Sequence, residues 1–198
     1  MKDSTKQHIE KYIKLLEAGE YDRFFKLAED NYVPQVTHDI AETLENAGIF
    51  PIPEMTFIPE GYYSLSEITE YTTPTNINSI NFKAFSASDI ETLHVTGNVK
   101  TIAESAFEAC DFLEKVVIDE GVRFISDDAF YSCENLEYVS LPKSLNRIGY
   151  LIFSRCDNLT SITFNGTQDE WYNIMNNEHI NDSCYISKII CTDGAILL

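Results

Sequence analysis

The sequence predicts a β-rich α/β solenoid of about five repeats of 23 residues with a small N-terminal helical cap. The first observation is that several columns of apolar residues share this period, as expected for units that bury their apolar sides by stacking. The second is an alternation inside each repeat that is typical of strands. The third is that the first 50 residues lack the 23-residue period and instead carry apolar residues at helical spacing. The predicted core ladder contains Phe107, Phe130 and Phe153; Cys110, Cys133 and Cys156; and Leu113, Leu136 and Leu159.

Residues 1–55 are expected to fold as short amphipathic helices. Ser4 and Gln7 have the spacing of a capping box, and apolar residues follow on one helical face until Gly19. Two further short helices are expected before the prolines that follow residue 50. Helices placed directly before a repeat array would cover the apolar edge of its first coil. We therefore expect either an N-terminal cap or a small helical module that binds partners by itself.

Residues 56–198 are expected to form the solenoid together with its C-terminal cap. The stretch Leu-x-x-Val-x-Ile of each repeat alternates like a strand, with the named residues pointing inward. The stretch Ala-Phe-x-x-Cys is too short for a full helix and predicts one helical or 3₁₀ turn. Phe85 lies one residue out of step with the later repeats, and Ala87 falls in the cysteine slot. The strands are expected near residues 68–73, 91–96, 114–119, 137–141 and 160–164.

Three central units read IAESAFEACDFLEKVVI, ISDDAFYSCENLEYVSL and IGYLIFSRCDNLTSITF. They resemble the BspA-type leucine-rich repeats, whose pattern reads roughly I-x-x-x-A-F-x-x-C-x-x-L-x-x-V-x-I-P, over about residues 60–191. The stretches 165–171 and 190–194 look like the closing segment of such arrays. The resemblance implies a curved leucine-rich-repeat solenoid with a non-catalytic role in protein binding. Many members of this family are bacterial surface adhesins.

The chain is strongly acidic, with 32 Asp and Glu residues against 14 Lys and Arg residues and a formal charge of −18. Such a surface repels nucleic acids and anionic membranes, so we expect a protein partner, and a basic one if the acidity takes part in binding. A solvated surface that keeps a repeat protein soluble explains the same charge. No signal peptide is visible, and inward cysteines suit a reducing compartment. These features predict a cytoplasmic protein.

The sequence offers no motif for catalysis or for a cofactor. It lacks the nucleophile motif G-x-S-x-G and the phosphate-binding motif G-x-x-x-x-G-K-[ST]. The cysteines do not form the closely spaced pairs that zinc sites use, and the four histidines share no spacing. We therefore expect no enzymatic activity, no metal site and no cofactor.

The outward strand positions form the candidate binding surface. They differ from repeat to repeat, whereas the inward positions recur, so only the outward ones can encode specificity. Tyrosine is a frequent interface anchor, and Tyr138 is expected to take that role. A plain solvated sheet face is the alternative interpretation. The predicted partner-binding face comprises His94, Lys115, Val117, Tyr138, Ser140, Ser161 and Thr163.

We predict that the protein acts without catalysis, by binding another protein through its short solenoid. One alternative is an acidic inhibitor encoded by a phage or another mobile element. It would block a basic, nucleic-acid-binding host defence protein by mimicking nucleic acid. A second alternative is a fragment of a bacterial surface adhesin.

Overall fold

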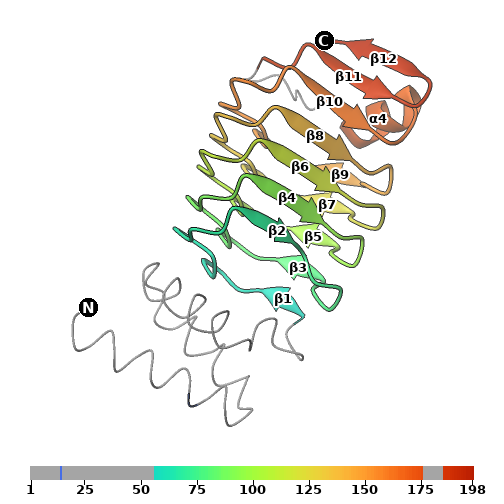
Figure 1. Ribbon diagram of the computed structural model, residues 1–198. Helices are drawn as coiled ribbons and strands as arrows, with labels where there is room; N and C mark the ends of the chain where they lie inside the picture. The colour runs from blue at the N-terminus through green and yellow to red at the C-terminus, as the bar shows by residue number, and fades with distance from the viewer. Residues whose placement is uncertain (1–13, 15–55, 176–184) are drawn as a thin grey trace.

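A computed structural model describes residue 14 and residues 56–175 and 185–198. The last two ranges form a solenoid whose coils stack along one axis (Figure 1). Apart from Lys14, residues 1–55 lie outside the described residues, so the helical cap stays a prediction.

Five successive coils each contribute one strand to a large sheet and one to a small sheet, and a C-terminal hairpin adds two more strands to the large sheet. The order of the small sheet is β1-β3-β5-β7-β9, and that of the large sheet is β12-β11-β10-β8-β6-β4-β2. The small sheet contains β1 (Phe57–Ile58), β3 (Ser79–Ile80), β5 (Thr101–Ile102), β7 (Phe124–Ile125) and β9 (Arg147–Ile148). The large sheet contains β2 (Glu70–Thr72), β4 (Thr92–Val95), β6 (Lys115–Ile118), β8 (Tyr138–Leu141), β10 (Ser161–Phe164), β11 (Lys188–Cys191) and β12 (Gly194–Leu197).

The large sheet confirms the predicted strands and their register. Parallel pairing aligns Leu93 with Val116 and Val116 with Val139, as the sequence columns require. These inward side chains are buried in the core between the two sheets. Full burial of one such side chain contributes about 1.5–3 kcal/mol. Because every coil repeats the same inward pattern, stacking the coils builds one continuous apolar core.

The small sheet was not predicted, because two-residue strands are too short to show an alternation. Ile80, Ile102 and Ile125 pair in register and are buried. Their neighbours Thr101 and Phe124 are partly or largely exposed on the other side. In the sequence each of these strands appears only as one recurring isoleucine, which by itself does not indicate a strand.

The Ala-Phe-x-x-Cys stretch forms a series of tight turns, and the prediction of a helical or 3₁₀ turn is wrong. Ser105 and Ala109 have φ angles of 54° and 56°, in the left-handed region. The N–H groups of Phe107 and Ala109 donate to the carbonyl oxygens of Ala129 and Tyr131 in the next coil, each at 2.8 Å. A helical turn would use these N–H groups within its own coil. The alternating conformation instead joins neighbouring coils along this side.

Stacked aromatic rings fill the core beneath these turns. Phe85, Phe107, Phe130 and Phe153 lie in one ladder, with successive ring centroids 4.9, 5.1 and 5.7 Å apart. Tyr63 begins the ladder at 4.7 Å from Phe85. All five side chains are at most 1% exposed. The ladder therefore links every coil to its neighbours through direct ring contacts.

The cysteine column runs beside the ring ladder and is fully buried. The thiols of Cys110, Cys133 and Cys156 donate to a phenylalanine carbonyl of the preceding coil at 3.1, 3.2 and 3.2 Å. Burial raises the pKa of the Cys133 thiol, so this group stays protonated and remains a donor. The column therefore combines apolar packing with a hydrogen bond between coils.

Ser88, not Ala87, occupies the cysteine slot of the preceding coil. Ser88 is 1% exposed, and its hydroxyl lies 3.5 Å from the Cys110 sulfur. Ala87 has a φ of 56° and takes the left-handed turn position that Ala109 takes in the next coil. The shorter coil lacks one residue after this slot, where the longer coils carry Phe112, Asn135 or Asn158. Ser88 was not predicted for this slot because serine differs from cysteine in hydrophobicity. Serine nevertheless matches cysteine in size and in the ability to form hydrogen bonds.

The C-terminal end is closed by α4 (Gln168–Met175) and by the antiparallel hairpin of β11 and β12. Thr167 and Glu170 form a capping box: Thr167 N donates to Glu170 Oε2 at 2.8 Å and Glu170 N donates to Thr167 Oγ1 at 3.2 Å. Trp171 is 2% exposed and its ring centroid lies 5.2 Å from that of Phe164. The helix therefore covers the apolar end of the core.

Candidate protein-interaction surface

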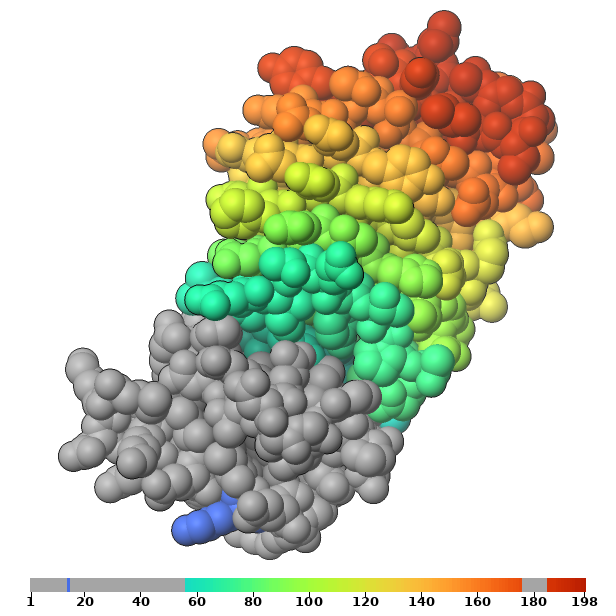
Figure 2. Space-filling view, in the orientation of Figure 1, coloured from blue at the N-terminus to red at the C-terminus, as the bar shows by residue number. Residues whose placement is uncertain are grey.

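Two rows of outward side chains cross the large sheet along the solenoid axis. We call them together the strand face, and it contains all seven residues of the predicted binding face. Figure 2 shows the side chains of successive coils stacked as parallel bands. The first row contains Glu70, Thr92, Lys115, Tyr138, Ser161 and Lys188, and the second contains Thr72, His94, Val117, Ser140, Thr163 and Ile190.

Tyr138 is the largest accessible group near the middle of the strand face. Its side chain is 44% exposed, and the Lys115 ammonium lies 5.8 Å from the ring centroid. A cation–π contact of this kind contributes about 0.5–1 kcal/mol at an exposed site, so it restricts the ring without covering it. Val117 is half-buried in the second row, next to Lys115 along the chain. These groups give the strand face a small apolar centre.

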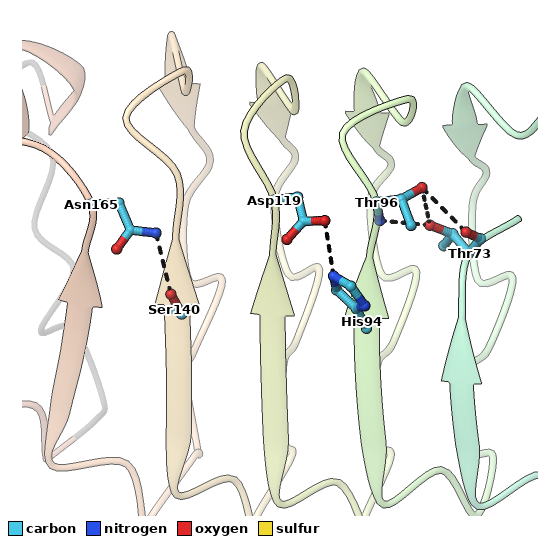
Figure 3. A network of polar contacts seen from close by, with 6 residues as sticks. All are labelled: Thr73, His94, Thr96, Asp119, Ser140 and Asn165. Carbon is cyan, nitrogen blue, oxygen red and sulfur yellow. Dashed lines mark hydrogen bonds and ion pairs between the residues drawn. The ribbon is translucent and has the colours of Figure 1, made fainter. Parts of the chain in front are cut away.

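Polar pairs between neighbouring strands occupy the end of the strand face at which the strands finish (Figure 3). His94 Nε2 lies 2.9 Å from Asp119 Oδ2, and both side chains are partly exposed. Asn165 Nδ2 donates to the Ser140 hydroxyl at 3.5 Å. Ser140 is only 8% exposed, so its side chain offers little surface to a partner. His94 and Asp119 remain accessible as a pair.

A band of carboxylates follows the edge at which the strands of the large sheet begin. One acid follows each cysteine slot, and in the middle coils a second acid directly precedes the strand. We call this band the acidic edge; seven of its eight residues are exposed and Asp89 is half-buried. Its members are Glu67, Asp89, Asp111, Glu134 and Asp157 after the slots, and Glu91, Glu114 and Glu137 before the strands.

Backbone hydrogen bonds hold the acidic edge in register. Glu114 N donates to Glu91 O at 2.9 Å, and Glu137 N donates to Glu114 O at 3.0 Å. None of the eight carboxylates forms an ion pair with another residue that the structure describes. Arg155 lies close to Glu134 and Asp157 of this band. Its pKa is raised mainly by a hydrogen bond to Tyr131 and, to a smaller extent, by the charges of these two acids. The acidic edge was not predicted, although the sequence shows an acid after every cysteine slot.

A second group of acids lies on the turns between the two sheets. Burial and the charges of Asp127, Glu104 and Glu108 raise the pKa of Asp128. Lys83 Nζ compensates part of this charge, at 3.1 Å from Glu108 Oε2. This group therefore contains an ion pair, whereas the acidic edge forms none with the residues that the structure describes.

Three features of the described residues concern a metal site, a ligand pocket and a membrane span. Within them, no group of three or more His, Cys, Asp or Glu side chains could hold a metal ion. A pocket of about 410 Å³ lies on the small sheet, and its polar side chains are an arginine, two carboxylates and two hydroxyls. No helix in the same ranges has the length and apolar character that a membrane span needs.

A stacked array with a recurring core and a variable outward sheet face defines a repeat protein built for surface contacts. A family model for the BspA type leucine rich repeat region matches residues 56–188 in six copies. The chain belongs to this family. The resemblance drawn from the three central units is thereby confirmed and extends to the weaker repeats before them.

Solved structures of bacterial leucine-rich repeat proteins are similar to this chain. A leucine rich cell surface protein from Faecalibacterium prausnitzii is 25% identical, with a TM-score of 0.43 over 58% of this chain and 36% of its own. A leucine-rich repeat protein from Bacteroides capillosus is 21% identical, with a TM-score of 0.49 over 58% of this chain and 90% of its own. The pneumococcal vaccine antigen PcpA is 20% identical, with a TM-score of 0.47 over 56% and 36%. No curated protein matches the sequence.

Proposed function

We propose that this protein is a non-catalytic scaffold that binds another protein through the strand face. The observation that carries the proposal is the contrast between the two sides of the large sheet. Inward positions repeat from coil to coil, whereas outward positions change between charged, aromatic, aliphatic and small polar side chains. Only the outward rows can therefore distinguish one partner from another. Membership in a leucine-rich-repeat family supports the same function.

The rigidity of the strand face suits a binding surface. Among the described strands, all that carry the strand face except β2 pair with neighbours on both sides, so a partner that binds there orders few additional groups. Tyr138 lies on β8, between β6 and β10, and is already restrained by Lys115. Truncating an aromatic anchor near the centre of an interface costs about 1–2 kcal/mol of binding free energy or more. Tyr138 is therefore the proposed anchor.

The proposal is tested by affinity capture with the full chain, identification of the captured protein, and titration of the purified partner. Tyr138→Ala is expected to weaken binding roughly 5- to 30-fold and to leave the far-UV circular dichroism spectrum unchanged. Tyr172→Ala is the matched control, because Tyr172 is 60% exposed on α4, which contacts β9 and β12 and carries no residue of the strand face. Unchanged affinity in both Tyr138→Ala and Val117→Asp would move the binding surface away from the strand face.

A second candidate function is inhibition of a basic nucleic-acid-binding protein by charge mimicry, and the acidic edge favours it. The middle coils present two carboxylates for each strand spacing of about 4.8 Å. This is about one charge per 2.4 Å, against about one per 1.7 Å along duplex DNA. Nucleic acid would then compete with the protein for the partner. A partner that binds both at once would exclude mimicry. The cytoplasmic location, a mobile-element origin and the adhesin alternative stay predictions.

A further inference from the structure

The strand face and the acidic edge form one continuous surface. Along the chain, Glu114 directly precedes Lys115 and Glu137 directly precedes Tyr138, the two residues of the cation–π contact. One residue along a strand covers about 3.3 Å, so the three carboxylates that directly precede strands lie about 10 Å from the second row. This width equals the diameter of an α-helix with its side chains, about 10–12 Å. A single helix therefore spans both features.

The spacing of the carboxylates along the axis also matches a helix. Five acids follow the five cysteine slots, so the column covers four strand spacings, about 19 Å. Five basic residues, placed alternately three and four positions apart on one face of a helix, cover about 21 Å. Alternate residues of an extended segment would cover about 26 Å. The helix therefore differs from the column by about 2 Å over its whole length and the extended segment by about 7 Å, so the helix fits the carboxylates more closely.

The charges on the surface set the orientation of such a helix. The acidic edge has no ion pair with other described residues, so its carboxylates are available to bases. From Thr92 onward the first row carries Lys115 and Lys188 among uncharged side chains, with the Tyr138 ring between the two lysines; the one acid of the row, Glu70, lies at its N-terminal end. A basic side chain is therefore favoured over the edge and disfavoured over the first row, where an apolar or acidic side chain fits.

We propose that the strand face, together with the acidic edge, binds a basic amphipathic α-helix of a partner protein that lies parallel to the solenoid axis. The inference rests on the proposed function and adds the class of partner. The basic side of the helix meets the carboxylates of the acidic edge. Its apolar side covers Tyr138 and Val117.

The test uses synthetic peptides and the full chain, with binding followed by fluorescence anisotropy. The matching peptide has about 18 residues, with lysines at alternate steps of three and four and leucines beside them. An isomer of the same composition distributes the lysines around the helix, and a third peptide contains proline to prevent helix formation. The matching peptide is expected to bind at least about 10-fold more tightly than either control. Its affinity falls steeply between about 50 and 200 mM salt.

Two triple variants locate the charge that matters. Changing Glu91, Glu114 and Glu137 to Gln removes three carboxylates of the acidic edge. Each exposed pair contributes a factor of roughly 1.5 to 5, so the triple variant is expected to bind the matching peptide roughly 3- to 100-fold more weakly. The control changes Glu60, Glu104 and Asp169 to amides, which removes the same charge from exposed positions outside the edge, and is expected to change affinity less than 2-fold.

The results distinguish this inference from the proposed function. Equal binding of the matching peptide and its isomer, or equal effects of the two triple variants, would overturn the helix proposal and leave the strand face as the general binding surface. An identified partner that is indifferent to Tyr138→Ala and Val117→Asp would overturn the proposed function. If the triple variant unfolds, Glu114→Lys is paired with a peptide in which one lysine is replaced by glutamate. Restored affinity in that pair supports the contact, and a further loss refutes it.

Discussion

Phe107 lies in the middle of the ring ladder, and Phe107→Leu tests whether the coils support one another through stacked rings. The Phe107 ring contacts Phe85 at 4.9 Å and 16° and Phe130 at 5.1 Å and 4°. Each stacked pair contributes about 0.5–1.5 kcal/mol beyond the buried area, so losing both is expected to cost about 1–3 kcal/mol. Leucine keeps most of the apolar volume, which limits cavity formation. A chain with an unfolding free energy of about 5–15 kcal/mol remains folded.

Urea unfolding gives the measurement, and the end of the ladder gives the control. If the free energy of unfolding falls by about 2 kcal/mol per molar urea, the expected loss of stability lowers the urea concentration at the unfolding midpoint by roughly 0.5–1.5 M. Trp171 fluorescence reports on the C-terminal end, where this ring is buried, while circular dichroism reports on all coils. Phe153 stacks on Phe130 alone among the described residues, at 5.7 Å. Phe153→Leu is therefore expected to cost about half as much.

Double-mutant cycles decide whether the rings couple only to their neighbours. The pair Phe107 and Phe130 is expected to show a coupling of about 0.5–1.5 kcal/mol. The pair Phe85 and Phe130, which is two coils apart, is expected to be additive within about 0.5 kcal/mol. Equal coupling in both pairs, or none in the first, would refute the nearest-neighbour reasoning.

Three further predictions concern single positions. Cys133→Ser is expected to lower the free energy of unfolding by only about 1 kcal/mol, because a hydroxyl can also donate to Phe107 O and Ser88 already fills the same slot in its own coil. Thermal melting measures the loss, and a loss above about 3 kcal/mol would contradict this expectation. Asp128→Asn is expected to raise the melting temperature at pH 7, because the raised pKa of Asp128 makes its ionised form less favourable in the folded state. The gain in melting temperature should vanish below pH ~3.9, where the carboxyl group is protonated in the unfolded state as well. A gain that persists below this pH would contradict the electrostatic cause. Gly97→Ala is expected to cost more than about 2 kcal/mol, because its Cβ would meet the backbone carbonyl of Glu120; a melting curve like that of the wild type would show that this turn can shift.

The large sheet and the cores of the central coils could be predicted because their signals are strictly periodic. Residues that point inward in every coil recur at a fixed interval, so Leu93, Val116 and Val139 reveal both the strand and its register. The alternating turns could not be predicted in the same way. Ser105 and Ala109 have no side-chain property that indicates a left-handed conformation. That conformation follows from the hydrogen bonds that each coil forms with the next.

The binding surface was predicted in part. The alternation of the strands placed Lys115 and Tyr138 outward, but not the contact between them, which depends on the spacing of neighbouring strands. Ser140 has the same alternation and is nevertheless buried, with the amide of Asn165 at hydrogen-bonding distance. Exposure therefore depends on neighbours that come from another coil.

By itself, the sequence determined the repeat, the inward columns, the family and the acidic charge, because each is a property of residue type and spacing. Only the tertiary structure decided which acids form one edge, that Ser88 continues the cysteine column, and that the turns join the coils through backbone hydrogen bonds. The physical reason is that stacking places residues 22 or 23 positions apart at about one strand spacing. Contacts at that distance depend on the register between coils, and a shift of one residue changes every one of them.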